Sequence, residues 1–280
     1  MIQIGEYNTL RIAGKNKDGL SLSDGKSEIL LPYDNFKEAL EIGNNVEVFV
    51  YINKTDDLVA TTKKAYGQCG DYVLLQCIDE HTDGAYLDLG IEKDVFVPKK
   101  EQKRPMIKGE SYVVYLYLDE LNRKLVASSK VDKFAIEQAE DLEEGDEVQV
   151  LICDKSDLGY NAIIDQKYMG LLYHNEIFGL LMPGDERRAW VKKIRVDGHI
   201  DLTLQASGYG HVLDTKDVIL EALAQNKGVI ALGDKSNPDD IYAAFEISKS
   251  VFKKAIGALY KERKIVVGDY EISLVEQSGD

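Results

Sequence analysis

Apolar and polar residues alternate in short runs along most of the first 206 residues, and clusters of Gly, Asn and Asp separate the runs. Val148, Val150 and Ile152 show this two-residue period, which places every second side chain on one face of a β-strand. The pattern predicts five short strands in each stretch of about 65 residues, and that size and strand count are typical of a small closed barrel of the OB type.

The barrel-forming part of the chain repeats itself. The strand pair VFVYIN and LVATTK within 48–63 returns as VYLYLD and LVASSK within 114–130. Residues 1–64 and 66–131 are therefore two copies of one unit, and a more diverged third copy occupies 142–206. Domains of this size bury only about 60% of the surface of the unfolded chain, so we expect the copies to pack against one another.

The hydrophobic period becomes helical in the last part of the chain. Thr215 is the predicted N-cap of a first helix, Pro238 fits the first turn of a second, and Ser248 is the predicted N-cap of a third that runs to about Lys261. The apolar face expected for the first helix consists of Val218, Ile219, Ala222 and Leu223. A hairpin over 265–275 follows, and this order of elements predicts a winged helix-turn-helix over 211–276.

The chain carries 34 Lys and Arg against 49 Asp and Glu, a formal charge of -15. This charge argues against a protein that coats duplex DNA or an anionic membrane through bulk electrostatics. The longest apolar runs, such as 113–118, are far shorter than the roughly 18 residues that cross a bilayer, and no secretory signal pattern opens the chain. We expect a cytoplasmic protein without a membrane partner, in which any nucleic-acid site is a local patch.

The sequence offers little for catalysis. The four histidines lack metal-ligand spacing, and the three cysteines form no Cys-x-x-Cys pair. No phosphate-binding Gly-x-x-x-x-Gly-Lys loop or Gly-x-Ser-x-Gly turn occurs. Carboxylates are abundant, but runs such as Glu143-Glu144 are typical of a solvated linker. We therefore predict no enzyme activity, no metal and no cofactor, which leaves a binding surface as the expected kind of site.

Three segments resemble strands of the S1-type RNA-binding domain: GAYLDL at 84–89, GLLYHNE at 170–176 and IDLTL at 200–204. The order of three such barrels and a winged helix, with PDDIY at 238–242 and FKKAIGALY at 252–260, is similar to the conserved virulence factor B family of Gram-positive bacteria. The resemblance implies a mainly β fold with α, made of three tandem S1-type OB-fold barrels and a C-terminal winged helix-turn-helix. It also implies an RNA-binding regulator without catalytic residues.

The S1 pattern has aromatic residues on the second and third strands, a histidine near the end of the third, and an Asp and a basic residue beside the fifth. The third copy offers Tyr160, Tyr173, His174, Asp197 and His199. The second copy offers Tyr86, Asp119 and Arg123, but its segment 94–98 replaces the expected Gly-Leu-x-His stretch. The first copy has Leu20 and Ser21 where an aromatic is expected, so we predict a structural role for it and a larger share of RNA affinity for the third.

The fourth strand distinguishes the copies in a second way. Alignment of the polar residues that end this strand, Asn53, Asp119 and Asp197, matches three pairs: Phe49 with Tyr51, Tyr115 with Tyr117, and Lys193 with Arg195. One interpretation is that the first two barrels expose aromatic pairs, while the third exposes positive charge that contacts RNA. The alternative is that the aromatic pairs seal the junctions between barrels.

The third helix of the winged domain reverses the charge of the chain. Its lysines are the expected RNA contacts: Lys249, Lys253, Lys254, Lys261 and, if the helix continues, Lys264. Helical spacing puts Lys249, Lys253, Gly257 and Lys261 along one stripe, with Phe252, Ala255, Ile256 and Leu259 on the core face. A glycine in a helix costs about 1 kcal/mol relative to alanine, which indicates a close approach by a backbone or a ligand. The alternative is a solvated lysine face.

Three functions compete at this point. The favoured one is a regulator of gene expression whose partner is single-stranded RNA, because a positive groove and stacking aromatic rings are what such strands require. The second is a transcription regulator that reads duplex DNA through the winged helix. The third is a protein-interaction scaffold, whose partners the sequence does not name. A nuclease is a distant fourth, because no catalytic module accompanies the barrels.

Overall fold

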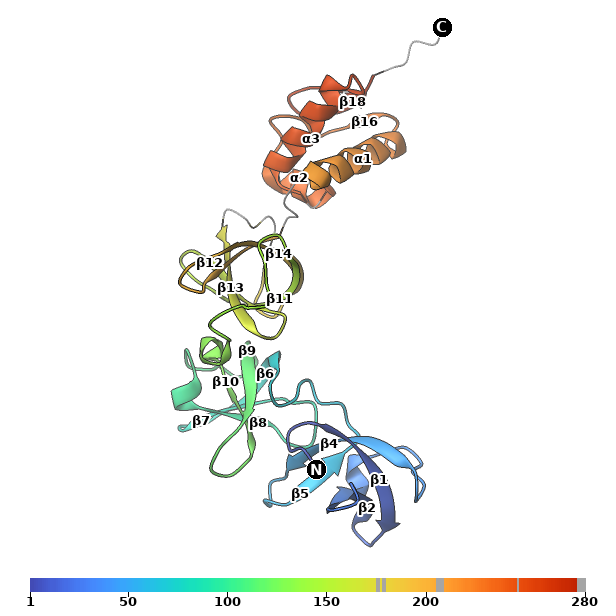
Figure 1. The fold of residues 1–280 in the computed structure, drawn as a ribbon, viewed down its shortest axis with the longest axis vertical. Helices are drawn as coiled ribbons and strands as arrows, with labels where there is room; N and C mark the ends of the chain where they lie inside the picture. The colour runs from blue at the N-terminus through green and yellow to red at the C-terminus, as the bar shows by residue number, and fades with distance from the viewer. Residues whose placement is uncertain (175–176, 178–179, 205–208, 246, 276–280) are drawn as a thin grey trace. The chain divides into compact units, whose positions relative to one another are not determined.

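The computed structural model describes residues 1–280 except 175–176, 178–179, 205–208, 246 and 276–280, with the backbone alone at 209–214. The chain divides into two compact units, Met1–Ala135 and Ile136–Asp280. Each unit is described by itself, with the element labels of Figure 1.

The first unit contains two closed five-stranded barrels, and the second unit contains a third. Barrel 1 consists of β1 (Tyr7–Lys15), β2 (Gly19–Ser23), β3 (Glu28–Pro32), β4 (Asn45–Ile52) and β5 (Leu58–Thr61). Barrel 2 consists of β6 (Tyr72–Glu80), β7 (Gly84–Leu87), β8 (Val95–Pro98), β9 (Ser111–Leu118) and β10 (Leu125–Ser128). Barrel 3 consists of β11 (Glu147–Lys155), β12 (Gly159–Ile164), β13 (Tyr168–Tyr173), β14 (Glu186–Ile194) and β15 (Ile200–Thr203).

All three barrels close in the same way. The first strand pairs with the second and fourth, and the third strand pairs in parallel with the fifth, as β3 does with β5. The register of the first strand shifts at one equivalent place in each copy, next to Ile12, Cys77 and Ile152. Such β-bulges bend a strand and help a short sheet to close. This repeated geometry confirms the expected OB-type architecture.

A glycine opens the second strand of every barrel for a steric reason. A Cβ atom at Gly19, Gly84 or Gly159 would lie 2.1, 2.4 or 1.8 Å from a backbone carbonyl oxygen of the neighbouring strand. No side chain fits at such distances, so only glycine permits the tight start of this hairpin.

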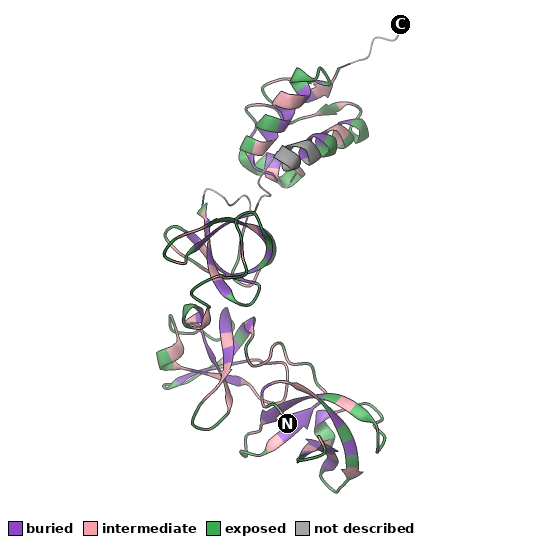
Figure 2. Ribbon diagram, in the orientation of Figure 1, coloured by how far each residue is buried: buried purple, intermediate pink, exposed green. Residues whose placement is uncertain are grey.

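The aromatic pair on β4 is buried, and this corrects the prediction that it is exposed. Phe49 and Tyr51 are 0% and 5% exposed, and they belong to the core cluster of barrel 2 together with Leu89 and Leu116. Figure 2 shows buried residues along β4 in purple. The rest of the barrel 1 core is a separate cluster that includes Leu22. The junction alternative is thus correct for β4, because its outward face is covered by the neighbouring barrel.

The corresponding pair on β9 is covered by a short 3-10 helix, η3 (Val131–Phe134). Phe134 stacks on Tyr115 with ring centroids 4.3 Å apart and contacts Tyr117 at 5.1 Å. Both tyrosines are half-buried, so this pair is also not an open aromatic patch. Two further 3-10 helices, η1 (Tyr33–Asn35) and η2 (Lys99–Glu101), follow the third strands of barrels 1 and 2.

The C-terminal part of the second unit is a winged helix, as predicted. It consists of α1 (Tyr209–Gln225), β16 (Val229–Ile230), α2 (Pro238–Phe245), α3 (Lys249–Lys261), β17 (Ile265–Val267) and β18 (Ile272–Leu274). The three strands form one sheet in the order β16-β18-β17. Ser248 caps α3 by accepting a hydrogen bond from the N–H of Val251, and α2 begins at Pro238.

Two details of α1 differ from the prediction. The helix begins at Tyr209, so Thr215 lies inside it and is not its N-cap. Its buried face contains Thr215, Ile219 and Leu223, whereas Val218 is 50% exposed. The reason is that residues four apart share a helix face. Thr215, Ile219 and Leu223 form the buried face, and Val218 lies outside this series.

Candidate nucleic-acid interface

Barrel 3 brings an aromatic ring and a guanidinium group together. Tyr173 ends β13, and the Cζ atom of Arg195 lies 5.9 Å from the centroid of its ring. Arg195 also donates a hydrogen bond to the hydroxyl of Tyr173 and pairs with Asp201 of β15, with 3.0 Å between Nη2 and Oδ1. The guanidinium is therefore held beside the ring hydroxyl by Asp201, an arrangement that places a cation next to a ring on which a base can stack.

Two histidines lie beside this pair. His174 follows Tyr173 in the chain, is exposed, and makes an edge contact with Tyr160 of β12 at 6.2 Å. His199 lies in the β14–β15 turn, where its backbone N–H donates to Asp197 and its ring lies 3.3 Å from the same carboxylate. These contacts hold the pKa of Asp197 below its usual value. Tyr160 packs partly against the barrel core, so only part of its ring faces solvent.

The register of β14 corrects the alignment of the fourth strands. Thr203 of β15 pairs with Trp190, whereas the equivalent residues of barrels 1 and 2 pair with Phe49 and Tyr115. A β-bulge between Val191 and Lys193 shifts the strand. Trp190 is therefore the counterpart of Phe49.

By the same register, Lys193 is the counterpart of Tyr51 and Tyr117. Arg195 replaces Asn53 and Asp119 at the strand end, since its N–H closes the equivalent hairpin onto His199. Lys193 is exposed. The contrast between aromatic and positive residues thus holds at one position of this strand rather than at two.

Barrel 2 places Tyr86 in a groove. The ring of Tyr86 contacts His81 at 5.4 Å and Phe96 at 5.1 Å. Four lysines line the same groove, together with His81, Asp79, Asp94 and Ile78: Lys54, Lys93, Lys108 and Lys124. The sequence pattern did not indicate these lysines, because they come from separate loops and one of them belongs to barrel 1.

Arg123 lies in the β9–β10 turn beside this groove. It has a left-handed backbone with φ of 57°, is exposed, and its N–H donates to the carbonyl of Asp119. It does not line the groove, but its neighbour Lys124 does.

Barrel 1 has no ring on β2. Leu20 is buried, and Ser21 donates a hydrogen bond to Glu28 at 2.7 Å. An aromatic residue does lie at the end of β3, where Tyr33 is 39% exposed and the Nζ atom of Lys15 lies 5.6 Å from its centroid. The S1 pattern did not point to this residue, because Tyr33 belongs to η1 and not to a strand.

The lysines of α3 and of the turn after it divide into two groups. Lys253 pairs with Asp234 at 2.8 Å, and Lys264, which lies beyond the end of α3 at Lys261, pairs with Glu262 at 3.2 Å. Among the described residues, Lys249, Lys254 and Lys261 make no ion pair, and the last two are exposed. The predicted core face is confirmed, since Phe252 and its partners on α3 are buried.

Gly257 lies on the same helix, and the structure gives no internal reason for it. A Cβ atom there would meet no atom within 4 Å. A close approach by another part of the chain therefore does not explain the glycine. The remaining explanations are a ligand that approaches this helix closely and a glycine that the helix simply tolerates.

None of the described helices is long and apolar enough to cross a membrane. Over the described residues, no group of three or more His, Cys, Asp or Glu side chains is arranged to hold a metal ion.

Comparison with known families assigns the domain types. The S1 domain matches residues 4–63 and 69–130, which cover barrels 1 and 2. The CvfB-like winged helix domain matches residues 217–274. Both are nucleic-acid-binding domain types, and neither is a catalytic domain. The domains that make up the chain therefore support nucleic-acid binding.

Relatives extend the match to nearly the full length. The chain is 28% identical to the uncharacterized protein YitL of Bacillus subtilis, over 93% of this chain and 90% of that protein. It is 25% identical to Conserved virulence factor B of Staphylococcus epidermidis, over 98% of this chain and 95% of that protein. The chain thus combines S1 domains with a CvfB-like winged helix, and it is similar over nearly its full length to the conserved virulence factor B proteins.

Proposed function

We propose that this protein is a non-catalytic, cytoplasmic regulator of gene expression that binds single-stranded RNA. The proposed domains are residues 1–64, 66–131 and 142–206 for the barrels and 211–276 for the winged helix. The observation that carries the proposal is the pair of Tyr173 and Arg195 on barrel 3, because a ring beside a fixed cation matches the alternating bases and phosphates of an unpaired strand.

The charge of the chain supports the same function. With a formal charge of -15, most of the surface repels a nucleic acid. Binding is then confined to the local sites where cations gather, which are the face of barrel 3, the groove beside Tyr86 and the lysines of α3. Each site is small, and several small sites on one chain suit a flexible single strand.

The test is a binding competition with the full chain. A labelled random single-stranded RNA is titrated across a series of salt concentrations, with duplex DNA of equal length as competitor. We expect salt-sensitive binding, with about 0.7 in log–log slope for each phosphate contact, and weak competition by the duplex. Preferential binding of the duplex would instead favour a DNA-reading winged helix, and the absence of salt-sensitive binding would favour a protein scaffold.

A further inference from the structure

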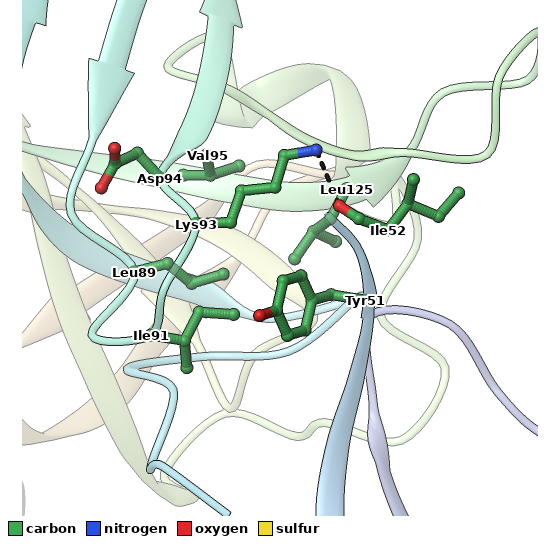
Figure 3. Close-up of a pocket in the computed structure, with 8 residues that line it drawn as sticks. All are labelled: Tyr51, Ile52, Leu89, Ile91, Lys93, Asp94, Val95 and Leu125. Carbon is green, nitrogen blue, oxygen red and sulfur yellow. Dashed lines mark hydrogen bonds between the residues drawn. The ribbon is translucent and has the colours of Figure 1, made fainter. Parts of the chain in front are cut away.

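The loop between β7 and β8 of barrel 2 is longer than its counterparts. It spans residues 88–94, whereas the equivalent loops span 24–27 in barrel 1 and 165–167 in barrel 3. Ile91 and Lys93 of this loop line a small pocket together with Tyr51 and Ile52 of β4 in barrel 1 (Figure 3). The extra length therefore forms a contact between the two barrels of the first unit.

Glu92 anchors this loop to barrel 1. Its carboxylate accepts hydrogen bonds from the hydroxyl groups of Tyr51 and Thr61, both at 3.3 Å, and pairs with Lys63 at 3.0 Å. Asn35 donates to the Tyr51 hydroxyl at 3.2 Å. Burial and the nearby Glu92 raise the pKa of Tyr51 to about 12. These contacts fix the angle at which barrel 1 meets the loop.

Lys93 holds the end of β4. Its ammonium group donates to the carbonyl oxygens of Ile52 at 2.7 Å and Asn53 at 3.2 Å, and Figure 3 shows its side chain extended toward Ile52. The pocket at this junction has a volume of about 20 Å³, room for little more than one water molecule. The turn that follows β4 therefore has a fixed position relative to barrel 2.

That turn carries Lys54 into the groove of Tyr86. Asp56, two residues later, pairs with Lys124 of barrel 2. Lys54 is exposed and lines the groove with Lys93, Lys108 and Lys124. Over the described residues, Lys54 and Lys108 make no side-chain ion pair, so two ammonium groups beside the ring are available to a ligand.

We infer that barrels 1 and 2 form one composite binding site for single-stranded RNA, in which a base stacks on Tyr86 and Lys54 of barrel 1 contacts an adjacent phosphate. The inference rests on the proposed function. It adds a second RNA site, on barrels 1 and 2, besides the site on the face of barrel 3. It gives barrel 1 a direct role in binding, and it explains why segment 94–98 departs from the S1 pattern: the preceding loop docks the neighbouring barrel.

Lys54→Ala in the full chain is the first test, with Lys26→Ala as the matched control. Lys26 is another exposed lysine of barrel 1, in the β2–β3 loop, and does not line the groove. If Lys54 contacts one phosphate, its loss lowers the log–log salt slope by about 0.7, equivalent to about fivefold weaker binding at 0.1 M salt. Lys26→Ala should bind like the parent.

A double-mutant cycle tests whether the junction presents Lys54. Glu92→Arg places a cation against Lys63 and should release the loop, while circular dichroism confirms that the chain stays folded. In that background Lys54→Ala should have no further effect on RNA binding. An equal loss in both backgrounds would overturn the composite site.

The outcomes separate this inference from the proposed function. If Lys54→Ala binds RNA like the parent while Tyr173→Ala binds it more weakly, the composite site is wrong and RNA binding stands on barrel 3. If the parent itself shows no salt-sensitive binding to single-stranded RNA, the proposed function fails, and this inference fails with it.

Discussion

Barrels 1 and 3 have the same strand order and the same bulge in the first strand, yet their surfaces differ. On barrel 1 the outward face of β4 is covered, with Phe49 fully buried. On barrel 3 the equivalent strand exposes Lys193 and leads to Arg195, whose guanidinium lies beside the hydroxyl of Tyr173. The comparison shows that a repeated fold fixes strand positions and leaves side chains free to make one copy a packing partner and another a binding surface.

The largest effect expected from this difference is on stability. Phe49→Ala removes a fully buried ring at the junction, and such changes cost about 3–5 kcal/mol in the free energy of unfolding. Tyr173→Ala, at a half-exposed ring, should cost far less. Urea denaturation followed by far-UV circular dichroism measures both.

The single tryptophan makes that experiment sharper. Trp190 lies on β14, so its fluorescence reports on barrel 3 of the second unit. We expect Phe49→Ala to lower the urea midpoint seen by circular dichroism and to leave the Trp190 transition unchanged. A coincident shift of both transitions would mean that the two units unfold together and that the junction does not act locally.

The next effect concerns RNA affinity. The double variant Tyr160→Ala with Tyr173→Ala should weaken RNA binding by about 1–3 kcal/mol for each lost stack. Tyr33→Ala removes an exposed ring from barrel 1 as a control. Fluorescence anisotropy with a labelled oligoribonucleotide gives the affinities, and Tyr173→Phe separates the ring from its hydroxyl. Parent-like affinity of the folded double variant would remove barrel 3 from the interface.

Alkaline pH should loosen the junction between barrels 1 and 2. The tyrosine pKa is 10.0 in the unfolded chain and about 12 for Tyr51 in the fold. The folded state therefore retains this proton more strongly, and its contribution is complete below pH 10 and is lost as the pH rises from 10 to 12. The loss is about 3 kcal/mol, since a pKa difference of one corresponds to about 1.36 kcal/mol.

The variant Tyr51→Phe isolates that contribution. Tyr168 of barrel 3, whose pKa the hydrogen bond to Asp141 also raises to about 12, remains in the variant. Stability should thus fall less steeply between pH 10 and 12 in Tyr51→Phe than in the parent, as measured by urea denaturation at each pH. Identical slopes would show that the Tyr51 hydroxyl is more exposed than the junction geometry indicates.

The smallest expected effect is on the salt dependence of binding by α3. Replacement of Lys249, Lys253 and Lys261 by alanine should reduce the log–log salt slope by about 0.7 for each phosphate contact that is lost. Because Lys253 already pairs with Asp234, we expect a smaller change from Lys253→Ala than from Lys261→Ala. Lys227→Asn, at an exposed turn outside α3, is the control. An unchanged slope in the folded triple variant would leave α3 as a packing element or a protein-docking surface.

The sequence was sufficient for the architecture because its signals are local. Alternation of apolar and polar residues with a period of two predicted the strands. The repeated strand pair predicted the tandem copies, and an N-cap residue, Ser248, predicted the start of the third helix. The start of α1 was missed because a buried threonine can lie within a helix, where its side chain faces the core like Ile219 one turn later.

The candidate interface was predicted less completely because it depends on packing between distant segments. The bulge before Lys193 leaves no mark in the alternation, so the counterpart of Phe49 was misassigned. The groove of Tyr86 collects Lys54, Lys93 and Lys124 from three loops and two barrels. These charges come together only because barrels 1 and 2 pack against each other. The spacing of the lysines along the sequence therefore does not predict the groove.

Ultraviolet cross-linking of the full chain to single-stranded RNA, followed by mass spectrometry of the linked peptides, tests the central claim most directly. We predict cross-links within 159–174, which contains Tyr160 and Tyr173, and fewer within 19–32 of barrel 1. Cross-links confined to 19–32, or none within 159–174 under conditions in which the RNA is bound, would contradict the assignment of RNA binding to the face of barrel 3.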